Sequence, residues 1–147
     1  MANRTILKFP NQILRNKSED VLVFDDDLKN DIQDIKDTLK VSNGVGLAAP
    51  QVSIFKKIIC IDMSRDEDLF LEEFKDQKEL VLINPVITPV LNKTEKEFEG
   101  CLSVPSFTYR VERFKEINVS AKLESGEDIN FNAKNMFARV LQHEVDH

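Results

Sequence analysis

Long apolar runs are absent from this 147-residue sequence. No stretch approaches the roughly 18 consecutive apolar residues that a membrane-spanning helix needs. The amino-terminal segment also lacks the apolar core of about 7–15 residues that a secretion signal contains. We therefore expect a soluble, cytoplasmic protein that binds no membrane.

An excess of basic residues is also absent. The chain has 20 Lys and Arg against 26 Asp and Glu, a formal net charge of -6, and a pI near 5.0. Binding to nucleic acid needs a basic patch, so nucleic acid is not the expected partner. At 16.9 kDa the chain has the size of one domain. We expect a single catalytic domain over residues 1–147, and we favour a monomer.

Cysteine is scarce, with two residues in different settings. Cys60 lies in the apolar stretch KIICID, which predicts a buried strand in which the thiol acts as a small hydrophobic group. Cys101 lies in EGCLS, just before Val104-Pro105, where Gly and Pro indicate a turn or a strand end. A disulfide between the two is disfavoured in a reducing compartment.

Histidine is equally scarce, and both residues close the chain in QHEVDH. On a helix, His143 and His147 at i and i+4 lie on one face, so both imidazoles can reach a single metal ion. Glu144 between them is placed to take a proton from water held by that ion, as in the HExxH motif of metal-dependent hydrolases. Two core histidines bonded to their neighbours are the alternative.

A third metal ligand is expected upstream, because no residue follows His147 in this sequence. Cys101 is the candidate. One thiolate and two imidazoles leave a fourth position open for water, which is typical of a catalytic site rather than a structural one.

The apolar spacing predicts an α+β fold. Leu28, Ile32, Ile35 and Leu39 indicate a helix of three to four turns, and a second helix begins near Lys134, with a predicted inward stripe of Met136, Val140, His143, Glu144 and His147. Strands are expected at 56–62, 80–87, 107–112, 116–123 and 128–132, with a hairpin turn at 124–127. We predict mainly antiparallel sheets around a central C-terminal helix carrying HEVDH, with one N-terminal helix. The acid-rich segment 64–79 is interpreted as a solvated insertion, with a flap over a substrate as the alternative.

The segment GVGLAA at 44–49 matches the loose dinucleotide fingerprint G-x-G-x-x-A. That fingerprint should follow a strand and open a helix, whereas this one follows a helix and precedes Pro50. The small residues instead predict a close approach of the main chain to a ligand or to the central helix. Gln51, directly after them, offers both donor and acceptor amide atoms.

Three motifs in this order, GVGLAAPQ at 44–51, EGCLS at 99–103 and QHEVDH at 142–147, resemble the signature motifs of the peptide deformylases. The resemblance extends to residues 6–15 and to LINP at 82–85. It implies removal of the formyl group from the N-terminal formyl-methionine of newly made polypeptides, by hydrolysis of a linear amide C-N bond. It also implies one divalent metal ion, Fe2+ in many members, with Zn2+, Ni2+ or Co2+ possible.

The resemblance implies a role for each matching residue. Cys101, His143 and His147 would bind the metal, and Glu144 would act first as general base and then as acid toward the departing amine. The Gln51 side-chain amide and the Leu102 backbone N–H would hold the developing oxyanion, in agreement with the donors that acyl transfer needs.

The substrate contacts follow from the same resemblance. Gly46 would pair its backbone with the N-formyl-methionyl peptide, and three residues would border the methionine pocket: Val45, Glu99 and Val140. Asp146 is expected to support the site by pairing with Arg113.

The sequence departs from the family in two places. Members generally continue past the last His with a Leu and a Gly, so either this catalytic core is naturally short or the sequence is a shortened one. Arg139 replaces an apolar residue of some members, which bears on the preference of the pocket. The alternatives are another HExxH amidohydrolase or metallopeptidase, which would cut internal bonds, and an inactive metal-binding homologue, which would release no formate.

Overall fold

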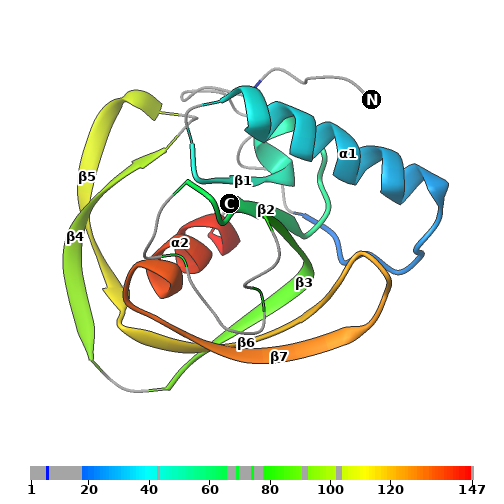
Figure 1. Cartoon of the computed structure of the whole chain (residues 1–147). Coiled ribbons are helices and arrows are strands. Elements are labelled where there is room, and N and C mark those ends of the chain that lie inside the picture. The colour runs from blue at the N-terminus through cyan, green and yellow to red at the C-terminus, as the bar shows by residue number, and fades with distance from the viewer. Residues whose placement is uncertain are drawn as a thin grey trace.

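A computed structural model describes residue 6 and residues 18–42, 44–65, 69, 74, 78–90, 93–101 and 104–146; for 95–101 and 104–111 it describes the main chain only. In Figure 1 a sheet separates two helices, and the C-terminal helix α2 lies inside the curve of the strands. Among the described residues, neither helix combines the length and apolar character needed to cross a bilayer.

The N-terminal helix α1 spans Asp26–Val41. Asp25 begins it as N-cap, accepting a hydrogen bond from the Leu28 backbone N–H at 3.0 Å. Acidic residues occupy its first turn and Lys40 its last, which suits the helix dipole. The four apolar residues of its predicted stripe are all buried, so the 3.6-residue periodicity is confirmed.

The strands form two antiparallel sheets. The five-stranded sheet has the order β1-β2-β3-β6-β7, and the two-stranded sheet pairs β4 with β5. The bounds are β1 Gly46–Ala48, β2 Ile58–Asp62, β3 Glu79–Pro89, β4 Thr94–Cys101, β5 Val104–Phe114, β6 Glu116–Lys122 and β7 Asp128–Lys134. A 3-10 helix, Ala49–Val52, follows β1 directly.

Strand β2 is buried along its whole length because both faces of the sheet are covered. Successive side chains of a strand point to opposite faces. Ile58 and Cys60 accordingly belong to the core under α1, and Ile59 and Ile61 to the core around α2. The molecule therefore has three layers, with α1 on one face of the sheet and α2 on the other (Figure 1).

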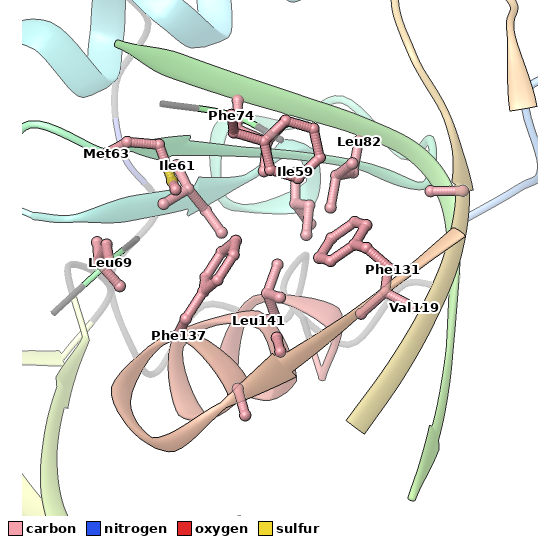
Figure 2. Close-up of a cluster of buried hydrophobic side chains, with 14 of the residues drawn as sticks. Ile59, Ile61, Met63, Leu69, Phe74, Leu82, Val119, Phe131, Phe137 and Leu141 are labelled. Atoms are coloured by element: carbon pink, nitrogen blue, oxygen red, sulfur yellow. The ribbon is translucent and has the colours of Figure 1, made fainter. Parts of the chain in front are cut away.

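Helix α2 spans Asn135–Val145 and leaves β7 through a sharp turn at Asn135, whose φ is 54°. Asn tolerates this left-handed conformation better than most residues. Phe137 and Leu141 point from α2 toward Ile59 and Phe131 in Figure 2. The Phe131 and Phe137 rings stack with centroids 5.9 Å apart.

The buried face of α2 differs from the predicted stripe. Glu144 is buried as expected, but Met136 is 38% exposed and its neighbour Phe137 is only 1% exposed. The apolar face is therefore displaced by one residue at the start of the helix, because the core is filled by the larger aromatic side chain. The predicted placement of Met136 is wrong.

The fold class is confirmed, with one N-terminal helix, antiparallel sheets and a central C-terminal helix. All five predicted strands and the turn at 124–127 are present. Strands β1 and β4 were not predicted: β1 has three residues, and half of the residues of β4 are charged, so neither shows a strand pattern. The interpretation of 64–79 as a solvated insertion is wrong at Leu69 and Phe74, which are buried in the core.

Phe137→Ala should lower the free energy of unfolding by about 3–5 kcal/mol, because it removes a buried ring from the core around α2. Met136→Ala, one residue away on the exposed side, should change it by less than about 0.5 kcal/mol. Urea denaturation of both variants measures the difference. Equal losses would contradict the observed orientation of α2.

Candidate active site

The carboxylate of Glu144 lies against the main chain of β1. Glu144 is 3% exposed, and a Cβ placed on Gly46 would stand 2.7 Å from its Oε2 and 3.0 Å from its Cδ and Cγ. A side chain at this position would require the Glu144 carboxylate to move. The sequence predicted that the main chain of the glycine-rich segment would closely approach either a ligand or the central helix. At Gly46 the structure places the central helix against it.

The chain entering β1 is held by Arg65, a residue that the sequence analysis did not single out. Its guanidinium donates hydrogen bonds of 2.5–2.8 Å to three main-chain oxygens, those of Lys40, Ser42 and Gly44. Asp62 pairs with Arg65 at 3.1 Å, and its backbone N–H donates to the Val45 oxygen at 2.8 Å. These bonds fix the approach of the main chain to Glu144.

Gln51 lies just beyond β1 in the 3-10 helix and is 1% exposed. Its Oε1 accepts a hydrogen bond from the Ala48 backbone N–H at 2.9 Å. An N–H donor requires the oxygen of the amide, so this bond determines which way the amide is turned. The Nε2 donor is therefore the amide atom that does not face the Ala48 N–H.

Cys101 is the last residue of β4, and its Cα pairs with that of Val104 at the start of β5. The register shifts between Gly100 and Cys101, so the strand pairing is irregular there. The side chains of Cys101 and Glu99 are outside the described residues, as is the whole of Leu102. The predicted roles of these three residues stay predictions.

Of the two predicted histidine ligands, His143 is half-buried on α2, whereas His147 lies outside the described residues. Within the described part of the chain, no group of three His, Cys, Asp or Glu residues could hold a metal ion. The predicted donor set of one thiolate and two imidazoles suits a divalent transition metal. His143 is next to the buried Glu144, so the described half of the motif fits such a site.

The predicted borders of the substrate pocket are only partly described. Val45 and Val140 are half-buried and pack against the core around α2. Cys60, by contrast, is buried in β2 on the α1 side and is a free thiol. Burial raises the pKa of the Cys60 thiol, and the Glu79 carboxylate adds to the shift. This confirms that Cys60 is a small core residue.

Polar contacts join α2 to the end of β5. The expected pairing of Asp146 with Arg113 is confirmed as an ion pair. Gln142, which had been noted only as part of the motif, bonds to both main-chain groups of Phe114. Arg139 is 6% exposed, so it is a buried residue of the helix. A contact between a helix side chain and a distant main chain has no signal in sequence periodicity.

Helix α2 thus carries His143 and the buried Glu144, whose carboxylate lies against Gly46 of β1. Both residues belong to an HExxH motif, which is typical of metal-dependent hydrolases. The family model described as polypeptide deformylase matches residues 3–147. The chain belongs to this family.

Individual relatives agree with the family model. A peptide deformylase from Thermodesulfovibrio yellowstonii is 39% identical, with coverage of 100% of this chain and 84% of the relative. The crystal structure of the Thermotoga maritima peptide deformylase superposes with a TM-score of 0.86 at 33% identity, covering 100% of this chain and 92% of the other. That of the Synechococcus elongatus enzyme in complex with actinonin gives 0.84 at 36% identity, covering 100% and 74%.

The chain is therefore an enzyme of protein biosynthesis, a hydrolase that removes the N-formyl group from the formyl-methionine of newly made polypeptides. Peptide deformylases are metal-dependent and act on formylated nascent peptides. These findings favour deformylation over the other HExxH activities that the motif alone allowed.

Gly46→Ala should displace the Glu144 carboxylate, because the new Cβ would stand 2.7 Å from Oε2. A displacement of about 1 Å in a reacting group can cost about 100-fold in rate, and we expect a loss of kcat of that order. Steady-state formate release per folded molecule measures it. Gly126→Ala is the control. Because the φ of Gly126 is 90°, this substitution should also lower stability, but it lies near Phe24 and not beside Glu144. A normal kcat in Gly46→Ala would show that the close contact is unimportant.

Proposed function

We propose that deformylation by this chain depends on Glu144 as the proton carrier, with Cys101, His143 and His147 as ligands of one divalent metal ion. The single observation that carries the proposal is the burial of Glu144 beside His143, with its carboxylate against Gly46. A buried carboxylate at the end of a helix needs a reason to be there, since burial of charge is costly. A proton-carrying role supplies that reason.

The proposed ligands come from two elements. His143 is on α2 and His147 follows that helix, while Cys101 ends β4. When bound, the metal would act as a Lewis acid that lowers the pKa of a coordinated water toward neutrality. We propose Fe2+ as the native ion, with Zn2+, Ni2+ or Co2+ able to replace it, because a mixed sulfur and nitrogen donor set accepts all four.

Glu144 would move one proton through the reaction. As the water oxygen bonds to the formyl carbon, the carboxylate accepts the proton that the water gives up. When the C–N bond breaks, the same group delivers that proton to the departing nitrogen, leaving a free amine and formic acid, which ionises to formate by losing its remaining proton to solvent. Close packing against Gly46 holds the carboxylate in one position for both transfers.

Negative charge develops on the formyl oxygen during this addition, and fixed donors would stabilise it. We assign this role to the Gln51 side-chain amide and the Leu102 backbone N–H. The bond from the Ala48 N–H to Gln51 Oε1 supports the assignment for Gln51, because it orients the amide before any substrate binds. A donor that is already oriented loses little entropy when charge appears.

The substrate peptide would bind along β1. This strand is at an edge of the five-stranded sheet, where its described partner is β2. The side of β1 that faces away from β2 can accept an extended peptide, with the main chain of Gly46 pairing with that of the substrate. We propose that Val45, Val140 and Glu99 border the methionine side chain; the half-buried apolar positions of the two valines support this.

The proposed setting follows from the substrate. Nascent chains are made in the cytoplasm, so we propose a cytoplasmic enzyme that acts as a monomer through one domain, residues 1–147. A net charge of -6 supports a partner recognised through its peptide rather than through nucleic acid.

Glu144→Gln should keep the metal but lose formate release from formyl-Met-Ala by about 100-fold to 10,000-fold, because an amide cannot carry the proton. Metal analysis and an assay of formate on the same sample test both parts. Glu127→Gln, at an exposed turn, is the control and should be fully active. Undiminished formate release by Glu144→Gln would overturn the role.

Cys101→Ala should lower metal content sharply, whereas Cys60→Ala should not, because Cys60 is buried in β2 under α1. Elemental analysis after dialysis compares the two proteins. If they retain equal amounts of metal, the thiolate of Cys101 is not a ligand.

A further inference from the structure

Gln142 connects α2 to the end of β5 through every polar atom of its side chain. The residue is 8% exposed and directly precedes His143. Its Oε1 accepts from the Phe114 backbone N–H at 2.9 Å, and its Nε2 donates to the Phe114 oxygen at 2.8 Å and to the Ala138 oxygen at 3.0 Å. Both N–H donors and the oxygen of the amide therefore have partners, and these bonds fix the rotation of the side chain.

This contact joins the two elements that carry the proposed metal ligands. Phe114 is the last residue of β5 and pairs with Thr94, the first residue of β4. Strand β4 ends at Cys101, while α2 carries His143. The ion pair between Arg113 and Asp146, the C-cap of α2, lies beside it, so both contacts join the base of the β4–β5 hairpin to the C-terminal end of α2.

The position of the hairpin depends on such links, because β4 and β5 pair only with each other in the described sheets. A two-stranded hairpin alone is marginally stable. Main-chain bonds such as that from the Lys115 N–H to the Lys93 oxygen close its base, and Gln142 connects that base to α2. In Figure 1 the hairpin curves away from this base around α2.

The geometry amplifies any movement at the base. Cys101 is seven residues from Thr94 along β4, which corresponds to roughly 23 Å of extended chain at about 3.3 Å per residue. Distances between metal and ligand tolerate errors of only about 0.2 Å. A small tilt of the hairpin on α2 would therefore separate a thiolate at Cys101 from the imidazoles by more than a metal site accepts.

We propose that Gln142 is a positioning residue that sets the spacing between the His-bearing helix and the Cys-bearing hairpin, and so controls how firmly the metal is retained. This inference rests on the proposed ligand set. Gln142 binds neither metal nor substrate; it acts through the placement of Cys101 relative to His143. A residue with a merely structural role would instead stabilise the metal-free and metal-loaded proteins alike.

The chain supplies a matched control in Asn84. Its Oδ1 accepts from the Val21 backbone N–H at 2.7 Å, and its Nδ2 donates to the Val21 oxygen at 2.8 Å. The same pair of amide-to-main-chain bonds is thus made on β3, and in the described part of the chain it joins that strand to Val21 rather than to α2 or the hairpin. Because the φ of Asn84 is 52°, Gly is the replacement that removes the amide without straining the backbone.

The experiment compares Gln142→Met, which keeps the length of the side chain but not its bonds, with Asn84→Gly. Both variants of the 147-residue chain are loaded with Zn2+, and the rate of zinc release to a chromogenic chelator is measured. Melting temperatures of the metal-free proteins are measured in parallel. We expect zinc release about tenfold faster from Gln142→Met, the scale seen when groups that orient ligands are removed, and a wild-type rate from Asn84→Gly.

Two results would overturn the proposal: a wild-type release rate for Gln142→Met, or equal acceleration in both variants. Cys101→Ala, measured in the same way, tests the proposed ligand set separately. If the Cys101→Ala protein releases zinc as slowly as wild type, Cys101 is not a ligand, and the ligand set itself is wrong. If Gln142→Met does not fold, Gln142→Glu replaces it. This variant keeps the acceptor for the Phe114 N–H and loses both donors, so faster release supports the proposal and an unchanged rate contradicts it.

Discussion

The site depends on one steric constraint, the absence of a side chain at Gly46. The Glu144 carboxylate can occupy its observed position against β1 because the main chain there presents no Cβ. The carboxylate is consequently buried between a helix and the main chain of β1, where water has little access and electrostatic interactions are strong. The Arg65 bonds and the paired strand β2 serve the same end, because they prevent β1 from moving away.

The two halves of the proposed metal site have different mechanical support. The His-bearing half belongs to α2, whose apolar face is packed into the core by Phe137 and Leu141. The Cys-bearing half belongs to a hairpin outside the large sheet, joined to α2 by polar contacts. Apolar packing fixes position without fixing direction, whereas hydrogen bonds fix both. At the junction, the Gln142 amide and the Arg113–Asp146 ion pair supply this directional contact.

Structural features that come from neighbouring residues in the sequence could be predicted, whereas those that come from contacts between distant residues could not. Local periodicity predicted α1 from Leu28 to Leu39, and an uninterrupted apolar run predicted β2, because burial on one or both faces leaves a direct pattern. Strand β1 has no such pattern, since three residues become a strand only by pairing with β2. The face of α2 was misplaced at Met136 because helical spacing does not say which of two adjacent apolar residues the core will accept.

The candidate site shows the same division. The HExxH spacing and the deformylase motifs singled out Glu144 and Gln51, and the structure places both in buried positions around β1. The supporting contacts of Arg65 and Gln142 were not predicted, because each joins a side chain to a main chain more than 20 residues away. Such bonds arise from the assembled fold, and nothing in their local sequence marks them.

Strand β2 contributes alternate side chains to both cores, and this arrangement makes unfolding of the protein cooperative. Removing α1 would expose Ile58 and Cys60, and removing α2 would expose Ile59 and Ile61, so loss of either helix uncovers one face of the same strand. Neither core can melt while the other keeps its full stability. Backbone amides of β2 should consequently exchange with solvent only when the whole molecule opens, and an inhibitor bound at β1 would slow exchange even under α1.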